Sequence, residues 1–434
     1  MALKYVGEIT DPIHKNIKFT QVEREIIDTD IFQRLRRIRQ LAGAHLVYPG
    51  ALHSRFEHSL GSMFLAGMAG QTLFDKGYFT DIDLIQQLRL AVLLHDVGHG
   101  PYSHLFEEIL KDSKNRSHEN LGERIILETK ISDIVKQNGY NPATISSLSF
   151  GKHKLGFLNE VISGGLSVDL MDYLPRDSYF SGTEYGKVDY FRIINSLEVS
   201  SSKILGINKS ALYSYESMLI SRYKMFKSVY FHKTVRSGEV MILLHSMKHL
   251  NQSLHLTDFD SLEDFFKLHD EQVLELLCNF RPSKSKPMDS FAVKLARDYK
   301  NRNLLKCIYE YFSLSNQRYE NERDNKQSRR LISRTIDFEK QIALMKSIIG
   351  RNQEFGEPVF LDISRAPSIP LAPKKEEVTS IMIISEKTEY EKSFDQLPLI
   401  NVITGYLDMM RVYTTTEKRK FFESMLKDSA NQKF

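Results

Sequence analysis

The stretch LLHDVGHGPYSH at residues 93–104 places three histidines and an aspartate directly after an apolar run. The apolar residues from Leu84 onward predict a helix that becomes buried as it approaches the histidines. Gly100-Pro101 is expected to end this helix, because proline cannot continue one and restricts the residue before it. His95 and His99 are four residues apart and would then share a helix face. The stretch indicates either a metal site or histidines that each have an ordinary structural partner.

Histidine and aspartate together are typical ligands of a divalent metal. Imidazole nitrogen with carboxylate oxygen suits Mn²⁺, Fe²⁺, Co²⁺, Ni²⁺ or Zn²⁺, and Mg²⁺ if more oxygens join. His95-Asp96 alone supplies too few ligands, so about two more are needed from elsewhere. A helical bundle could bring other clusters to this pair, since helix-length segments separate them. The candidates are His53, Glu57 and His58, then His118 and Glu119, and then Asp169, Asp172 and Asp177. Each alone is explained by a helix cap or a turn, and only their conjunction favours a site.

The composition indicates a globular protein with a sizeable core, since 41% of the residues are hydrophobic and 26% are charged. The net charge of +4 suits anionic small molecules and is too weak to indicate a nucleic-acid binder. The two cysteines, Cys278 and Cys307, stand alone, which favours a reducing compartment over a disulfide framework. We see no segment of signal-peptide or membrane-span length, and we therefore predict a cytoplasmic protein without a membrane partner.

The residue patterns predict a mainly α fold, with a helical domain over 1–335 and a small α+β lobe over 336–434. In the first part, Ile31, Leu35, Ile38 and Ala42 recur at helical spacing, with arginines on the other faces. The segment 217–250 predicts a long helix or a closely spaced pair, and 257–277 predicts an amphipathic helix. After the polar run 321–330, strand-like segments follow around 359–363, 378–387 and 406–416, and 417–428 predicts a closing helix.

The clusters also carry a family resemblance. His58, His95-Asp96 and Asp169 resemble the H…HD…D signature of the HD-domain metal-dependent phosphohydrolases. The segments 40–61, 93–107, 117–119, 168–177 and 228–235, in this order, resemble the deoxynucleoside triphosphate (dNTP) triphosphohydrolases of that superfamily. The sequence RVY at 411–413 extends the likeness to almost the whole chain, without a sterile-alpha-motif domain. The resemblance implies an HD helical bundle and hydrolysis of a dNTP to deoxynucleoside and triphosphate.

The resemblance also implies roles for single residues. One divalent transition metal, or Mg²⁺, would be held by His58, His95, Asp96 and Asp169. His118 would be the general acid for the leaving 5′-oxygen, with Glu119 holding its imidazole. The residues expected around the phosphates are His99, His104 and Arg55, with Glu107 orienting His104. Those expected around the sugar are Gln40 and Asp177 at the 3′-hydroxyl, and Leu41, Tyr173 and Tyr230 against the deoxyribose.

A regulatory site follows from the same resemblance. Asp28, Gln33 and Arg36 stand as in the family's guanine-effector pocket, which forms between subunits. GTP or dGTP is therefore the expected effector, and a homo-oligomer, with a tetramer as its expected size, is the expected assembly. The alternative explanation is a helix N-terminus with Asp28 or Asp30 as its cap.

The chain departs from the vertebrate members at three places. Leu170 replaces a triphosphate-binding lysine, Phe226 replaces a histidine, and Thr414-Thr415-Thr416 replaces effector-binding lysines. Two alternatives therefore stay open. The first is another HD phosphohydrolase, acting on nucleoside monophosphates, cyclic nucleotides or guanosine polyphosphates. The second is a non-catalytic module that senses nucleotides or binds single-stranded nucleic acid through the arginines of 33–40.

Overall fold

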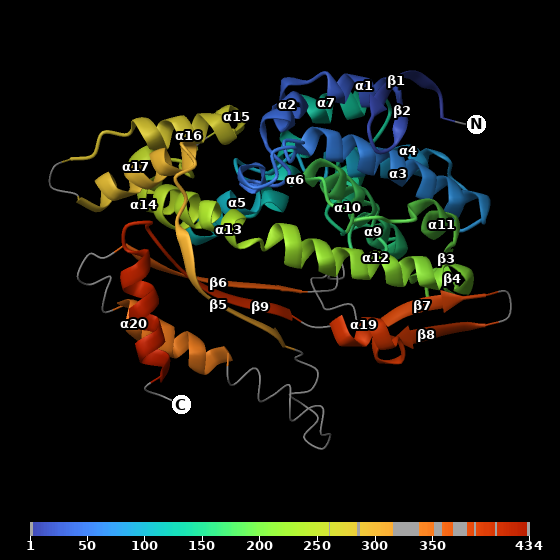
Figure 1. Ribbon diagram of the computed structural model, residues 1–434. Helices are drawn as coiled ribbons and strands as arrows, with labels where there is room; N and C mark the ends of the chain where they lie inside the picture. Colours follow the sequence, from blue (N-terminus) through green and yellow to red (C-terminus); the bar gives the residue numbers. More distant parts are fainter. Residues whose placement is uncertain are drawn as a thin grey trace.

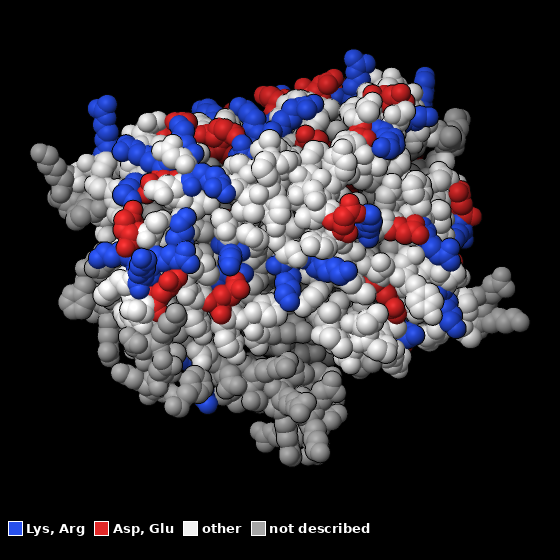
Figure 2. Space-filling model, in the orientation of Figure 1, with Lys and Arg blue, Asp and Glu red and all other residues white. Residues whose placement is uncertain are grey.

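The computed structural model describes residues 3–259, 261–283, 287–315, 338–350, 358–367, 380–385, 388–403 and 406–431. It shows a large helical body with β-sheets packed beneath one of its long helices (Figure 1). This is the mainly α fold that the sequence predicts. Basic and acidic side chains alternate over the face drawn in Figure 2, in keeping with the small net charge. No helix in the described ranges is long and apolar enough to span a membrane.

The first half of the chain forms an N-terminal hairpin followed by the helices that surround the site. The hairpin strands are β1 (Tyr5–Asp11) and β2 (Lys15–Thr20), and they pair antiparallel. The helices that follow are α1 (Gln21–Ile27), α2 (Asp30–Gln33), η1 (Arg34–Arg37), η2 (Ala44–Leu46), α3 (Arg55–Asp75), α4 (Asp83–Leu94), α5 (His104–Lys114), α6 (His118–Glu128), α7 (Lys130–Gln137), α8 (Pro142–Ser149), α9 (Gly156–Ile162), α10 (Val168–Ser181) and α11 (Tyr190–Asn195).

Helix α3 packs against both α4 and α10. His58 lies on α3, the aspartates Asp169, Asp172 and Asp177 lie on α10, and His95 is the C-terminal cap of α4. Ser54 and Glu57 form a capping box that starts α3 just before His58. Ser167 caps α10 by accepting a hydrogen bond from the Leu170 amide, which places Asp169 in the first turn. Capping residues therefore fix the helix ends from which two of the predicted ligands project.

Three sequence predictions about helix length were wrong, two of them in this half of the chain. The helix through Leu84 ends at Leu94, before Gly100-Pro101, so His95 and His99 do not share a helix face. The helix predicted over 31–42 ends at Arg37, and Ile38 is extended. Tertiary hydrogen bonds explain the second ending, because the Arg39 amide donates to the Asp270 carboxylate at 3.0 Å and residue 39 bridges to Ser54.

The second half of the chain continues with helices before it reaches the larger sheets. The helices are η3 (Lys209–Ala211), α12 (Leu212–Met225), the π-helical turn η4 (Phe226–Tyr230), α13 (Lys233–Glu239), the π-helical η5 (Val240–Met247), α14 (Lys248–Leu254), α15 (Leu262–Lys267), α16 (Asp270–Asn279) and α17 (Pro287–Lys300). The segment 217–250 therefore lies in a closely spaced pair of helices, as predicted, one over 212–230 and one over 233–254, each containing a π-helical turn. One of these turns, η4, carries Phe226 and Tyr230, two of the residues that the sequence analysis discussed. The amphipathic helix predicted over 257–277 is divided into α15 and α16, because Leu268 between them is extended.

The C-terminal part contains the strand and helix segments that the sequence predicts, and two sheets join it to the helical body. One sheet has the order β3 (Leu197–Val199), β4 (Leu205–Asn208), β7 (Ser380–Ile384) and β8 (Glu389–Ser393). The other has the order β5 (Lys306–Ser315), β9 (Tyr406–Thr414) and β6 (Val359–Pro367). The remaining elements are η7 (Phe394–Gln396), α19 (Pro398–Ile403) and α20 (Arg419–Asn431). The predicted boundary at 335/336 lies outside the described residues, and both sheets include strands from either side of it.

Candidate metal centre and substrate cavity

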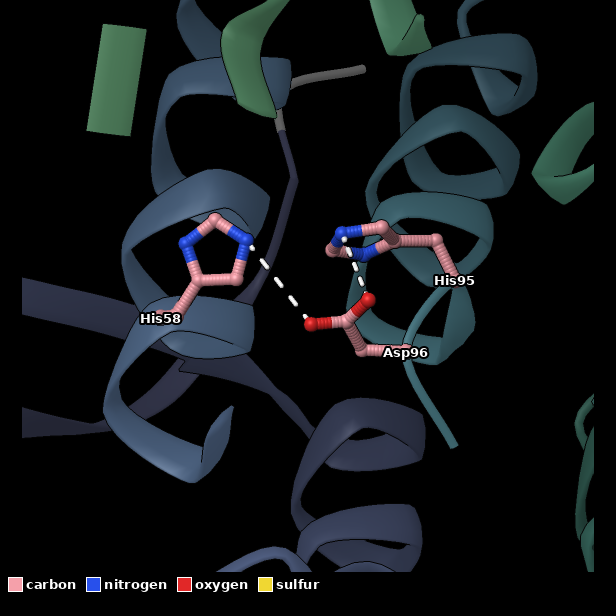
Figure 3. Close-up of side chains that lie close together, drawn as sticks. All are labelled: His58, His95 and Asp96. Atoms are coloured by element: carbon pink, nitrogen blue, oxygen red, sulfur yellow. Dashed lines mark ion pairs between the residues drawn. The ribbon is translucent and has the colours of Figure 1, made fainter. Parts of the chain in front are cut away.

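Four side chains from three elements meet between α3, α4 and α10. The ligand atoms of His58, His95 and Asp96 lie within 4.8 Å of one another, and Figure 3 shows the three side chains pointing toward a common point. Asp169 joins them from α10, with its Oδ1 3.0 Å from His58 Nε2 and 3.8 Å from His95 Nε2. Two imidazole nitrogens and two carboxylates are a donor set that fits a divalent metal.

The electrostatics of the cluster also favour a cation. Burial alone would lower the pKa of His58, but hydrogen bonds to Asp169 and Asp172 outweigh it and raise the pKa to about 10. Burial would likewise lower the pKa of His95, and the Asp96 carboxylate instead raises it. Carboxylates that stabilise a positive charge on neighbouring histidines also stabilise a metal ion at the same point. The four residues therefore fit the metal that the sequence analysis expects.

The loop after α4 has an unusual backbone that the sequence signalled through its glycines. Tyr102 and Ser103 both have positive φ, at 56° and 55°, a conformation that non-glycine residues rarely adopt. The Asp270 carboxylate accepts the Tyr102 amide at 2.7 Å, and the Ser103 hydroxyl accepts from Arg55 Nε at 2.7 Å. These contacts hold the strained loop in place, as is common beside functional sites.

Gly98 is required in this loop by a close approach of two backbones. A Cβ at this position would lie 2.0 Å from the His118 carbonyl oxygen and 2.5 Å from the Gly122 amide nitrogen. Only glycine allows the loop to pack against the start of α6 at this distance. The glycine therefore brings His118, the predicted general acid, next to the metal ligands.

A second histidine group lies beside the cluster. The rings of His99 and His118 stack with their centroids 4.0 Å apart, and His104 meets His99 edge-on at 5.2 Å. Glu107 Oε1 lies 2.9 Å from His118 Nδ1, and Glu107 Oε2 lies 3.5 Å from His104 Nδ1. Burial alone would raise the pKa of Glu107, but its contacts with His104 and His118 hold the pKa far below the usual range. The glutamate predicted to orient His104 therefore also contacts His118.

Burial also affects His99, the innermost histidine of this group. Burial lowers its pKa well below the usual value, and the positive charges of Arg55 and His118 add to the effect. Its Nδ1 is buried and has no hydrogen-bond partner among the described residues. A neutral imidazole with a free nitrogen suits the predicted contact with water or a phosphate oxygen. Glu119, the other acidic residue expected near His118, lines the same space, and its role stays a prediction.

One cavity of about 570 Å³ unites the metal cluster with the predicted sugar residues. This volume is in the usual range for a small-molecule site. The predicted residues that line it are Gln40, Leu41, Arg55, His95, Asp96, His99, His104, His118, Glu119, Asp169, Tyr173, Asp177 and Tyr230. Of the predicted metal and substrate set, His58 alone is absent from this lining, because it lies behind the cavity wall with its side chain 1% exposed.

The side chains predicted to bind the sugar make polar contacts around Asp177. The Tyr230 hydroxyl donates to Asp177 Oδ2 at 2.6 Å, and His53 Nε2 lies 2.8 Å from Asp177 Oδ1. Burial is the main cause that raises the pKa of Tyr230 well above its usual value, and the nearby Asp177 charge raises it further. The phenol therefore keeps its proton. Gln40 Oε1 is buried and has no hydrogen-bond partner within the described part of the chain. These polar atoms converge where a ligand hydroxyl would need both a donor and an acceptor.

Sequence reasoning missed one side chain of the cavity and misplaced another. Arg222 on α12 lines the cavity, and its guanidinium lies 4.2 Å from the Phe226 ring centroid. Nothing in the local sequence around Arg222 indicates this position. Asp172 was noted as a candidate ligand, but it lies behind His58 and contacts His58 Nδ1 at 2.7 Å. Its three-residue spacing from Asp169 was the available signal, since residues three apart share a helix face.

The predicted effector residues lie apart from the cavity. Gln33 Nε2 donates to the Ile27 carbonyl at 2.8 Å, and Arg36 Nε donates to Gln33 Oε1 at 2.8 Å. Asp28 is exposed and lies 3.6 Å from Arg24, at the C-terminal cap of α1. The alternative explanation for this segment, a helix N-terminus capped by Asp28 or Asp30, was wrong about the capping residue. Thr29 caps α2.

A His–His–Asp cluster between packed helices, with a neighbouring histidine group, fits a metal centre. Residues 55–175 match the HD domain and residues 188–427 match the HD associated region. The chain belongs to the HD-domain phosphohydrolase superfamily and combines the HD domain with this associated region.

Relatives extend over most of the chain. An uncharacterized protein of Methanocaldococcus jannaschii is 32% identical over 435 residues, which cover 98% of this chain and 83% of that protein. The deoxynucleoside triphosphate triphosphohydrolase SAMHD1 homolog of Dictyostelium discoideum is 32% identical over 324 residues, which cover 70% of this chain and 60% of that protein.

Solved structures share the fold. A hypothetical protein from Aquifex aeolicus superposes with a TM-score of 0.75 at 28% identity, covering 96% of this chain and 99% of that one. A phosphohydrolase from Bacteroides thetaiotaomicron superposes with a TM-score of 0.70 at 25% identity, covering 94% and 99%. The shared fold therefore includes the sheets of the C-terminal part as well as the helical body.

Proposed function

We propose that this protein is a metal-dependent dNTP triphosphohydrolase, which cleaves a dNTP to deoxynucleoside and triphosphate. The observation that carries the proposal is the single cavity of about 570 Å³ in which the metal cluster, the histidine group and the predicted sugar residues meet. The SAMHD1 homolog of Dictyostelium discoideum, which is named for this activity, supports the choice of substrate.

Phosphate hydrolysis needs charge neutralisation, a positioned water and a proton for the leaving group. A metal held by His58, His95, Asp96 and Asp169 would supply charge neutralisation and activate water. Arg55 stands beside the cluster, with Nη1 2.5 Å from Asp96 Oδ2, and adds a fixed positive charge for a phosphate. Arg222 offers a second guanidinium in the cavity.

His118 is the group that we assign to the leaving oxygen. Its side chain is 22% exposed, so its proton can be renewed from solvent. Glu107 Oε1 lies 2.9 Å from its Nδ1 and leaves Nε2 for the leaving oxygen. Glu107 therefore orients the acid.

The sugar end supports a deoxyribose. Gln40 Oε1 can accept a hydrogen bond from a 3′-hydroxyl, and Asp177 can do so after a small adjustment. The rings of Tyr173 and Tyr230 have their centroids 6.4 Å apart and form an aromatic corner for the sugar. A corner closed by two rings leaves an added 2′-hydroxyl without room or partner, and the loss of its hydration disfavours a ribonucleotide.

Product analysis tests the proposal. The purified protein is incubated with each dNTP, NTP and dNMP under Mn²⁺, Mg²⁺ and Co²⁺, and the products are separated by chromatography. We expect deoxynucleoside and triphosphate in equal amounts from dNTPs. Release of orthophosphate, or turnover of monophosphates or cyclic nucleotides, would favour another HD phosphohydrolase. No turnover with any metal would favour a non-catalytic nucleotide-binding module.

We also propose that GTP or dGTP activates a homo-oligomer through Asp28, Gln33 and Arg36. The exposed carboxylate of Asp28 and the exposed Arg36 support a ligand at this end of α2. Thr414 will not contribute to such a site, because it is buried and donates to the Pro358 carbonyl. Rates and molar mass measured across GTP concentrations test this, and flat values of both would remove the effector from the proposal.

A further inference from the structure

The buried side of the metal centre is as ordered as the side that faces the cavity. His58 directs Nε2 toward Asp96 and Asp169, and its Nδ1 lies 2.7 Å from Asp172 Oδ2. The side chains of His58 and Asp172 are 1% and 0% exposed. The carboxylate therefore holds the ring from its Nδ1 side and keeps Nε2 directed toward the other ligands.

Asp172 is itself held by two further side chains. His14 Nε2 lies 2.6 Å from Asp172 Oδ1. Arg176, one turn further along α10, donates from Nε to Oδ2 and from Nη2 to Oδ1, both at 2.9 Å. Gly61 on α3 makes room for this arrangement, because a Cβ there would lie 1.9 Å from Asp172 Oδ1. Both oxygens of Asp172 are thus fixed by several donors, and the carboxylate has little freedom to rotate.

The N-terminal hairpin supplies the next layer. Asp11, at the end of β1, accepts from the His14 amide through Oδ1 at 2.8 Å and from Arg176 Nη1 through Oδ2 at 2.8 Å. The His14 ring also packs 5.3 Å from the Phe64 ring and lies 3.4 Å from the Tyr190 hydroxyl. The hairpin turn is therefore joined by hydrogen bonds to the same carboxylate that contacts a metal ligand.

We propose that the hairpin turn Asp11–His14 acts as a positioning element for the metal centre, with His14 and Arg176 orienting Asp172, and Asp172 orienting His58. The turn lies outside residues 55–175, which match the HD domain. The HD domain of this protein consequently depends on a preceding segment for its full metal affinity. This inference rests on the metal centre alone and is independent of the substrate.

Metal titration tests the inference. Mn²⁺ affinity of the metal-free full chain is measured by competition with a fluorescent chelator, and bound metal is counted after dialysis. We expect Asp172→Asn and His14→Ala each to weaken Mn²⁺ binding by about 10–100-fold, the usual range for outer-shell partners. His14→Gln retains a side-chain N–H donor near the same place, and we expect it to recover part of the affinity.

A matched control is available in the same chain. His249 Nε2 and Asp289 Oδ1 form a histidine–carboxylate pair at 2.9 Å between α14 and α17, remote in sequence from the site. Asp289→Asn should lower thermal stability without changing Mn²⁺ affinity. An unchanged Mn²⁺ affinity in His14→Ala, with only a loss of melting temperature, would overturn the proposal. If Asp172→Asn does not fold, the His14→Ala and His14→Gln pair decides the question.

The outcome is separable from that of the proposed function. A chain that hydrolyses no dNTP would still show the expected order of Mn²⁺ affinities if the hairpin positions His58. Conversely, equal affinities in wild type, His14→Ala and His14→Gln would overturn the positioning role even in an active dNTP hydrolase.

Discussion

Two groups of histidines paired with carboxylates flank the metal ligands, and they differ mainly in their access to water. On the inner side, His14, Asp172 and Arg176 are all buried, with side chains 0% exposed. On the cavity side, the His104 side chain is 75% exposed and that of His118 is 22% exposed. The chemical groups are similar. A histidine–carboxylate pair that is shielded from water fixes the geometry of its neighbours, whereas a solvent-accessible pair can exchange protons with water. Solvent access therefore separates positioning from proton transfer.

The largest expected effect comes from the ligands that lie between the two groups. His95→Ala removes one ligand while leaving Arg55 paired with Asp96, so the fold should stay intact. We expect loss of bound metal and a fall in hydrolysis of at least roughly 10³-fold, because several kcal/mol of charge stabilisation disappear. Metal analysis of the purified variant, together with its rate, checks this.

Asp96→Ala should also empty the site, but it leaves the Arg55 guanidinium buried without its carboxylate. We therefore expect an additional loss of stability of about 3–5 kcal/mol. Full metal occupancy with normal turnover in either variant would refute the ligand assignment.

The second largest effect concerns His118, in the solvent-accessible histidine group on the cavity side. His118→Ala should keep metal and substrate binding and lose about 10²–10⁴-fold in kcat, the usual contribution of a general acid. Steady-state kinetics and substrate affinity, measured on the same preparation, check the split between kcat and binding. Equal losses of binding and turnover would make His118 a phosphate-binding residue.

The sequence predicted the polar residues of the cavity better than it predicted the backbone that carries them. His58, His95, Asp96 and Asp169 meet, as the spacing and the resemblance implied. The backbone that carries these residues differs from the prediction, because α4 ends at Leu94 and a strained loop then carries the segment 95–103. That loop depends on Asp270, far along the chain, and no local pattern reports a contact of such long range.

The inner group was harder to foresee for a related reason. Asp11, His14 and Arg176 look like turn and surface residues in the sequence, and they become a network only when the hairpin docks on α3 and α10. Arg34 is a similar case, because it was expected on an outer helix face. It is buried instead, and donates to the His99 carbonyl at 3.0 Å. A buried charge has the same sequence signature as an exposed one until the tertiary partners are known.

Asp177 contacts both the protein interior and the cavity: one carboxylate oxygen lies beside the buried His53, and the other accepts from Tyr230, which lines the cavity. Tyr230→Ala should open the 2′ side of the sugar site and raise the NTP-to-dNTP ratio of kcat/KM by about 10-fold. Matched pairs such as GTP and dGTP give that ratio. If Tyr230 only fills space, the variant should lose about 3–5 kcal/mol of stability with its selectivity unaltered.

The smallest effect concerns stability and pH. Contacts with His104 and His118 hold the pKa of Glu107 below its usual value, against the effect of burial. A depressed carboxyl pKa stabilises the fold above the unfolded pKa of about 4.5, and this contribution is lost as pH falls below that value. Because solvent screens the pair, we expect Glu107→Gln to cost about 1 kcal/mol at pH 7 and less at pH 4.

Urea unfolding of both proteins at the two pH values measures this difference. Glu123→Gln, which breaks a surface ion pair with Lys152, is the control and should have almost no effect at either pH. A cost for Glu107→Gln that stays constant from pH 7 to pH 4 would contradict the linkage.

The path of the chain through its sheets limits how the protein can be divided. β4 pairs with β7, and β5 pairs with β9, although at least 90 residues lie between the members of each pair in sequence. Any cut between 315 and 359 would leave a strand edge without its partner in both fragments, and open edges promote association between molecules. The two sheets thus join the helical body that carries the candidate site to the C-terminal strands. A shortened form that is soluble, folded and active should therefore be difficult to obtain.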